Sequence, residues 1–198
     1  MPRAGLDRPT VGALALEVVD EGGPTGFTDL TLSAVAARAG VAVPSLYKHV
    51  GGLHELRLDV AATCVADFAH ALAAARDTAA RNGTDPAHAL RAMAHATRSY
   101  ALTRPGRYQA VQGAGWPSDP GAQAVRDAAL RAVDALAGAV AAVGVPPERQ
   151  IDAVRAFRAG LHGFVALELG GGFGMPQDVD ASFHYLVDLL IAGLTAQR

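Results

Sequence analysis

Cysteine is nearly absent from this chain, which has one, Cys64, in 198 residues. A single cysteine excludes an intramolecular disulfide and a metal site built from several cysteines. No apolar run reaches the roughly 18–20 residues that a membrane-spanning helix needs, and the first eight residues lack the apolar core of a signal peptide. These absences predict a cytoplasmic protein without a membrane partner.

An excess of basic charge is also lacking. The 17 Lys and Arg stand against 19 Asp and Glu, a net charge of −2, and the first 60 residues hold five basic and seven acidic side chains. A module that binds nucleic acid usually carries a basic surface. Any such site must therefore depend on local arrangement, where Arg38, Lys48 and Arg57 are expected to face only Glu55 and Asp59.

The composition, with 51% hydrophobic and 18% charged residues, is that of a globular protein. Apolar residues recur at helical spacing, and no segment alternates with the period of a strand. We therefore expect an all-α fold of about nine helices, with an irregular stretch over 105–121. The expected helices begin at Thr10 and then cover about 32–39, 44–50, 53–81, 86–102, 119–143, 148–169 and the chain after Pro176.

The most informative stretch is a pair of short helices joined by a tight turn. Thr31 is a good N-cap for the first helix, and Gly40 can end it because glycine readily adopts positive φ. Pro44 suits the first turn of the second helix, in which Leu46 and Val50 are spaced to point inward. This pattern predicts a helix-turn-helix, supported by a helix that Thr10 caps.

Over these residues the chain resembles the tetracycline-repressor (TetR) family of bacterial transcriptional regulators. The residues that carry the resemblance are Val35-Ala36, Ala39-Gly40-Val41, Leu46-Tyr47, His49-Val50 and Leu56. The segment from Leu161 to Glu168, with the glycine-rich stretch behind it, also looks like the C-terminal domain of an actinobacterial TetR subgroup. The resemblance implies a helix-turn-helix DNA-binding domain over 1–57, with its motif at about 32–51, and a helical ligand-binding and dimerisation domain over 58–198.

Two positions depart from the family pattern. Val50 stands where an aromatic residue is usual, and Leu53, after Gly51-Gly52, stands where a lysine usually begins the next helix. The second departure removes a phosphate contact, so backbone N–H groups at that helix start are expected to contribute more. Residues 1–9 are expected to form a mobile arm from which Arg3 and Arg8 could reach a DNA groove.

The candidate DNA contacts lie on and beside the second short helix. The resemblance implies that Tyr47 and His49 contact phosphates, whereas Val43, Pro44, Ser45 and Lys48 lie where base edges can be reached. Thr31 and Ser33 begin the supporting helix and could donate to phosphate. The complete set is Thr31, Ser33, Val43, Pro44, Ser45, Tyr47, Lys48, His49 and His54.

The second domain is expected to bind a small molecule and a second copy of the chain. A mostly apolar pocket with a few polar groups would suit an effector of unknown identity, and its candidate lining is Tyr100, Tyr108, Trp116, Phe157 and His162. The last two helices form an apolar hairpin suited to a two-fold four-helix bundle. The candidate homodimer contacts are Leu161, Val165, Phe183, Leu186, Leu190 and Leu194.

The sequence offers little support for catalysis or metal binding. It contains no phosphate loop, nucleophile elbow or paired carboxylates at catalytic spacing. His88 and His95 lie two helical turns apart, too far to share a metal without further ligands. We therefore expect no enzyme, no cofactor and no metal, and a ligand-released repressor on a palindromic double-stranded DNA operator.

Two alternatives stay open. One is a small-molecule-binding or enzymatic α-helical bundle with a vestigial helix-turn-helix, which the acidic balance and Leu53 favour. The other is a protein-interaction module that uses the apolar C-terminal hairpin.

Overall fold

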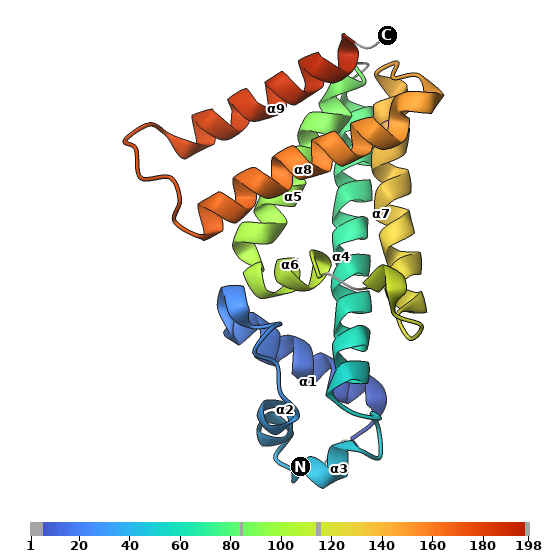
Figure 1. The fold of residues 1–198 in the computed structure, drawn as a ribbon, viewed down its shortest axis with the longest axis vertical. Helices are drawn as coiled ribbons and strands as arrows, with labels where there is room; N and C mark the ends of the chain where they lie inside the picture. Colours follow the sequence, from blue (N-terminus) through green and yellow to red (C-terminus); the bar gives the residue numbers. More distant parts are fainter. Residues whose placement is uncertain (1–5, 84, 114–115, 197–198) are drawn as a thin grey trace. The chain divides into compact units, whose positions relative to one another are not determined.

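The computed structural model describes residues 6–83, 85–113 and 116–196, and within these ranges it contains nine α-helices and no strand (Figure 1). The predicted all-α class is therefore confirmed. The helices are α1 (Arg8–Glu21), α2 (Leu32–Ala39), α3 (Val43–Leu46), α4 (Leu53–Asn82), α5 (Ala87–Thr103), α6 (Pro105–Val111), α7 (Gln123–Ala142), α8 (Gln150–Leu169) and α9 (Val179–Thr195). Three short 3₁₀ helices join them: η1 (Gly23–Thr25), η2 (Trp116–Ser118) and η3 (Pro147–Arg149).

The chain forms two compact units, each of which is built from two stretches of sequence. The first contains residues 1–66 and 104–128, and the second contains residues 67–103 and 129–198. By compactness the segment 104–128 thus belongs with the N-terminal helices. The division by function at residue 57 remains a prediction.

The N-terminal helix begins earlier than the sequence suggested. Asp7, and not Thr10, caps α1, because its Oδ1 accepts a hydrogen bond from the Thr10 N–H at 2.8 Å. This hydrogen bond lowers the pKa of the Asp7 carboxyl. Arg8 is the first residue of the helix and pairs with Glu55 and Asp59 of α4, so it is not part of a mobile arm. Arg3 lies outside the described residues.

The helix-turn-helix forms as its spacing predicts. Thr31 Oγ1 caps α2 by accepting from the Ala34 N–H at 3.2 Å, and Gly40 ends the helix with φ +66°. The second helix, α3, is shorter than the expected 44–50. It closes with a bond from the His49 N–H to the Leu46 carbonyl, and Gly51-Gly52, which disfavour helix, follow one residue later.

A thirty-residue helix, α4, contributes to both units. An 18-residue window within α4 has a mean hydropathy of 1.4. By length and composition alone, this helix is long and apolar enough to span a membrane. The expectation that no unbroken apolar run of this length exists still holds, because Asp59, Asp67 and His70 interrupt α4. The apolar side chains of α4 nevertheless serve a protein interior, because Leu56 and Val60 are buried in the first unit and Phe68 and Leu72 in the second.

The stretch expected to be irregular contains a helix, α6. Pro105 occupies its first turn, where the missing N–H of proline costs nothing, so a Pro-Gly pair that looks like a break also starts a helix. Within the first unit α6 packs on α1 and η1. Gly106 permits this close approach, since a Cβ there would lie 2.5 Å from the Val19 carbonyl oxygen.

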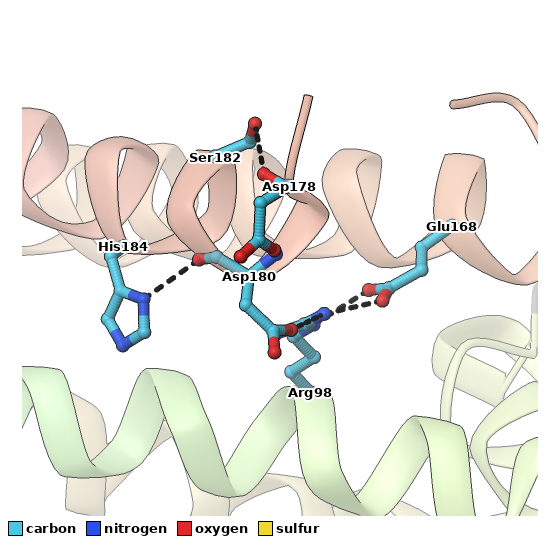
Figure 2. Close-up of polar contacts among 6 residues, drawn as sticks. All are labelled: Arg98, Glu168, Asp178, Asp180, Ser182 and His184. Atoms are coloured by element: carbon cyan, nitrogen blue, oxygen red, sulfur yellow. Dashed lines mark hydrogen bonds and ion pairs between the residues drawn. The ribbon is translucent and has the colours of Figure 1, made fainter. Parts of the chain in front are cut away.

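In the second unit α8 and α9 form an antiparallel hairpin that packs on α5. Figure 2 shows the polar centre of this contact, where Arg98 of α5 donates to both carboxylate oxygens of Glu168 at 2.7 and 2.6 Å and pairs with Asp180. The carboxylates of Glu168 and Asp180 raise the pKa of Arg98. The guanidinium also lies 4.9 Å from the ring centre of Phe183, so one cation joins three helices.

Candidate DNA-binding surface

The short helix α3 separates a buried side from an exposed one. Leu46 is fully buried and Val50 is 3% exposed, as their spacing predicted, so both anchor the helix in the core of the first unit. The next residue after Leu46, Tyr47, is 57% exposed, and Lys48 is also exposed. A large aromatic held in water beside a fully buried leucine is a group available for contact with a partner.

The other predicted DNA contacts surround this helix in the same unit. Thr31, Ser33 and Pro44 are exposed, whereas Val43, Ser45 and His49 are half-buried. The Thr31 hydroxyl oxygen already serves as the cap of α2, but a hydroxyl can still donate its own hydrogen. These side chains thus lie on or beside the two helices of the motif. Their contact with DNA remains a prediction.

The turn after α3 is fixed by the first residues of α4. Glu55 Oε2 accepts a hydrogen bond from the Gly51 N–H at 2.7 Å, and Gly52 has a φ of +152° that suits glycine. At the same helix start, His54 is exposed and its Nε2 lies 3.0 Å from Asp119 Oδ2. The helix start therefore has its own cap and places an imidazole beside a carboxylate.

Most basic side chains near the motif are paired. Arg38 forms ion pairs with Glu17 and Glu21, and these hydrogen bonds raise its pKa. Arg57 donates to the carbonyls of Thr28 and Leu30 at 2.7 and 3.1 Å. The expectation that these two cations would face only Glu55 and Asp59 is therefore wrong, because α1 supplies acids that the linear sequence places far away.

Lys48 differs from Arg38 and Arg57, since it has neither an ion-pair nor a hydrogen-bond partner among the residues that the structure describes. Its ammonium is the basic group near the motif that is most available to a phosphate or a guanine.

The five predicted ligand-binding residues belong to different units. Tyr108 and Trp116 lie in the first, where the Trp116 ring stands edge-on to Phe27 with ring centres 6.1 Å apart. Tyr100, Phe157 and His162 lie in the second. Tyr100, Tyr108 and Phe157 are each no more than 4% exposed. The structure thus describes no single site that contains all five.

His162 differs from the buried aromatics because it is half-buried and titratable. Burial lowers the pKa of its imidazole, and the nearby Arg158 cation acts in the same direction. A neutral imidazole at an apolar helix face can accept or donate a hydrogen bond, which keeps His162 as a candidate ligand contact.

The six predicted dimer residues divide by burial. Leu161, Val165, Phe183 and Leu194 lie in the interior of one chain, at no more than 8% exposure, so they pack its own core. Leu186 and Leu190 are half-buried and keep the predicted role as a proposal. The helical spacing located the inner face of the hairpin correctly, and its contact with a second copy stays an untested prediction.

The hairpin also carries apolar side chains that are exposed. Ile151, Leu167, Tyr185 and Leu189 are between 52% and 70% exposed. A groove of about 280 Å³ separates the start of α8 from the end of α9. Its lining comprises Val145, Arg149, Asp152, Ala153, Ala156, Phe157, Leu189, Leu190, Gly193 and Leu194.

Sequence reasoning missed the polar contacts of the segment 104–128. Arg107 pairs with Asp20, and Asp119 pairs with His54. The partners are 87 and 65 residues apart in the chain, so no local pattern could have related them. The one local signal available was Pro105, which could have indicated a helix start.

Comparison with known proteins identifies the family. Residues 90–190 match the model described as "Tetracyclin repressor-like, C-terminal domain". The chain is 35% identical to the uncharacterized HTH-type transcriptional regulator Rv0681 of Mycobacterium tuberculosis, over 98% of this chain and 88% of that protein.

Solved structures of similar proteins agree with this family assignment. A TetR variant from Acinetobacter baumannii AYE in complex with minocycline is 25% identical, covers 98% of this chain and 99% of its own, and has a TM-score of 0.68. The transcriptional regulator SCO7222, a TetR from Streptomyces coelicolor, shares the fold at 21% identity, with a TM-score of 0.67 and coverages of 98% and 99%. The chain therefore belongs to the TetR family and is a transcriptional regulator of that type, not an enzyme.

Proposed function

We propose that the protein is a ligand-responsive repressor that binds a palindromic operator as a homodimer and releases it when a small molecule binds. The observation that carries the proposal is the exposed Tyr47-Lys48 pair directly after α3, next to the buried Leu46 that fixes the helix. A small domain that keeps in water, at the end of α3, an aromatic and a cation without an ion-pair partner among the described residues presents a surface suited to a polyanion.

Each residue of this surface has a role that its chemistry supports. Tyr47 and His49 contact phosphates and hold α3 in the major groove, while Lys48 donates to guanine O6 or N7. Val43, Pro44 and Ser45 approach base edges, and Thr31, Ser33 and the start of α4 with His54 contact the backbone of the duplex.

A homodimer provides the second recognition helix that a palindrome requires. The exposed apolar side chains of the α8–α9 hairpin support this proposal, because Tyr185 and Leu189 of α9 present area that a second copy would cover. The groove between α8 and α9 lies beside Leu189 and could receive a side chain from the other copy.

The effector is proposed to be a small molecule bound by the second domain, with Tyr100, Phe157 and His162 among its contacts. Support comes from the half-buried His162 and from the solved TetR variant of Acinetobacter baumannii, which is in complex with minocycline. The effector of this chain need not be a tetracycline. It must bind the DNA-incompetent state more tightly than the competent one. Regulators of this type act in the cytoplasm, which we propose for this protein.

The test is binding of the purified full-length protein to the DNA upstream of its own gene, compared with scrambled DNA of the same length. We expect sequence-dependent binding. The logarithm of the association constant should fall linearly with the logarithm of the salt concentration. Binding no tighter than to scrambled DNA would contradict the proposal.

That negative outcome would favour a small-molecule sensor with a vestigial helix-turn-helix. The observation behind this second candidate is that Arg8 and Arg38 are paired with acidic side chains, which reduces the charge available to phosphates.

A further inference from the structure

The segment from Thr28 to Leu30 leads into α2, and a side chain of α4 holds its backbone. Arg57 Nη2 donates to the Thr28 carbonyl at 2.7 Å and to the Leu30 carbonyl at 3.1 Å. The Leu30 side chain is fully buried, and the next residue, Thr31, caps α2. One nitrogen of Arg57 therefore fixes two carbonyls within the three residues before the cap of α2.

A side chain of α6 holds the same segment by its other backbone group. The Thr28 N–H donates to Gln109 Oε1 at 3.0 Å, so the N–H and the carbonyl of one residue are both bonded to side chains of other helices. The Asp29 N–H donates to the Thr25 carbonyl at 2.9 Å. All these residues belong to the first unit. Since residues 28–30 form no helix or strand of their own, side-chain bonds here satisfy backbone groups that a helix or strand would otherwise pair.

The surroundings of Arg57 are not those of a side chain that reaches out to a phosphate. Arg57 is half-buried, whereas Lys48 is exposed. The Arg57 Nε is buried and has no hydrogen-bond partner among the residues that the structure describes, and its Nη2 is engaged by the two carbonyls. We therefore expect Arg57 to act through the segment that it holds.

The start of α2 carries two of the predicted phosphate contacts. Thr31 and Ser33 are exposed there, and the Thr31 hydroxyl accepts from the Ala34 N–H while keeping a hydrogen to donate. Helix α3 packs on α2, and the Val41 N–H donates to the Ala36 carbonyl at 3.0 Å across the turn between them. A shift at the start of α2 would therefore displace its hydroxyl groups and the helix that packs on it.

We propose that Arg57 and Gln109 are positioning residues for DNA binding, which hold residues 28–30 so that α2 and α3 contact one operator site together. The proposal rests on the proposed function, since it requires DNA on the surface formed by these two helices. Neither side chain needs to contact DNA. A segment that is already held in the free protein loses less conformational freedom on binding, which lowers the cost of forming the complex.

The experiment measures binding of the full-length protein to operator DNA and to scrambled DNA by fluorescence anisotropy over a range of salt concentrations. The variants are Arg57→Met, Gln109→Met, Lys48→Met and Arg131→Met. Methionine keeps an unbranched apolar side chain and removes the groups that form the hydrogen bonds. Arg131 is an exposed arginine of α7, so its variant controls for the change in net charge that Arg57→Met and Lys48→Met also make.

We expect Gln109→Met to weaken operator binding roughly three- to tenfold, the range that corresponds to one lost hydrogen bond. Arg57→Met should weaken it at least as much. In both variants the slope of the logarithm of the association constant against the logarithm of the salt concentration should equal that of the wild type, because no phosphate contact is removed. Lys48→Met should flatten this slope, since it removes a cation from the DNA surface itself, and Arg131→Met should bind as the wild type does.

Two results would overturn this proposal alone, with specific binding by the wild type intact. One is wild-type operator affinity in both Arg57→Met and Gln109→Met, compared at equal folded fraction by circular dichroism. The other is a slope that flattens by about one in Arg57→Met, which would show that Arg57 itself contacts a phosphate. Gln109→Met removes a single bond to an exposed residue, so it decides the question even if Arg57→Met does not fold.

Amide hydrogen exchange of the free protein tests the contact with Gln109 in the absence of DNA. The Thr28 amide should exchange several-fold faster in Gln109→Met than in the wild type. Gln109→Glu should restore its protection, because a glutamate oxygen can accept from the same N–H. Unchanged exchange of Thr28 in Gln109→Met would also contradict the proposal. Wild-type protein that does not prefer its operator over scrambled DNA would instead overturn the proposed function, and this inference with it.

Discussion

The guanidinium of Arg107 on α6 donates to both carboxylate oxygens of Asp20 on α1, at 2.8 and 2.6 Å. Beside this pair, the Thr28 N–H donates to Gln109 Oε1 at 3.0 Å. Because a two-pronged ion pair fixes orientation as well as distance, these contacts tie a helix from the middle of the chain to the first helix of the DNA-binding module.

Removal of this pair should loosen α6 while leaving the unit folded. Arg107→Ala is expected to destabilise the contact by roughly 0.5–1 kcal/mol, since both partners are partly exposed. Amide hydrogen exchange in residues 105–111 should become several-fold faster. Arg131→Ala, an exposed arginine of α7, is the control. Equal exchange in the two variants would show that the pair does not hold α6.

The glycine at the α6 contact should be intolerant of a side chain. A Cβ on Gly106 would lie 2.5 Å from the Val19 carbonyl and 2.7 Å from that of Gly23, both of which are backbone atoms that cannot rotate away. We expect Gly106→Ala to cost about 1–3 kcal/mol of unfolding free energy, measured by denaturant titration.

The matched control is Gly12→Ala in α1, where a Cβ would meet nothing within 4 Å. Alanine favours helix over glycine by about 0.5–1 kcal/mol, so this variant should be more stable than the wild type. Similar effects at both positions would argue against a close helix contact at Gly106.

The α5–α9 contact should weaken on acidification. His95 and His184 have ring centres 4.9 Å apart, between the Arg91–Asp188 and Arg98–Asp180 ion pairs. Burial lowers the pKa of His95 below 6.5, and His184 and Arg98 act in the same direction, whereas Asp180 opposes them. The unfolded chain therefore binds a proton at a higher pH than the folded one.

The direction in which stability changes with pH follows from this difference in pKa. As pH falls below about 6.5 the unfolded state takes up the proton first, so the stability contributed by neutral His95 is lost, until the folded pKa is passed. Denaturant unfolding should show that the wild-type free energy of unfolding is lower at pH 5.5 than at pH 7.5. The decrease should be smaller for His95→Phe, which keeps an aromatic ring against Phe183. The same loss in both proteins would exclude His95 as its source.

Tyr47→Ala should separate DNA binding from stability. The side chain is 57% exposed, so its removal should change the unfolding free energy by less than about 0.5 kcal/mol. Loss of a phosphate contact should weaken operator binding about tenfold, equivalent to about 1.4 kcal/mol. Sedimentation should show an unchanged oligomer. A variant that loses the dimer would contradict this division of roles.

The proposed dimer should depend on the exposed apolar side chains of α9. Leu189→Asp places a charge where the side chain is 57% exposed in one chain, and should shift the protein to monomer by sedimentation. Leu130→Asp alters a residue of α7 that is 59% exposed and serves as the control. If both variants sediment as the wild type does, the hairpin is not the interface.

Local patterns predicted much of the fold, because helix starts and stops are encoded within a few residues. Thr31 begins α2 and Gly40 ends it, as expected, and Leu46 and Val50 are buried as their spacing indicated. The same reasoning failed at α6, where Pro105 and Gly106 resemble a break and in fact allow a helix to start and pack closely.

Part of the candidate site could likewise be predicted from the sequence, and part could not. The sequence located Tyr47 and Lys48 in the helix-turn-helix motif, since a family motif and a helical period are local properties, although α3 itself ends at Leu46. It could not foresee that Glu17 and Glu21 would pair with Arg38, or that Asp119 would face His54. Electrostatic partners are set by which helices pack together, not by distance along the chain.

The sequence by itself determined the all-α class, the helix-turn-helix and the family, because helical periodicity, caps and a contiguous motif need no tertiary information. Only the tertiary structure decided which side of the C-terminal hairpin is core. Leu161, Val165, Phe183 and Leu194 are apolar at helical spacing, which predicts burial without naming the partner. Packing within one chain covers them and leaves Tyr185 and Leu189 exposed instead.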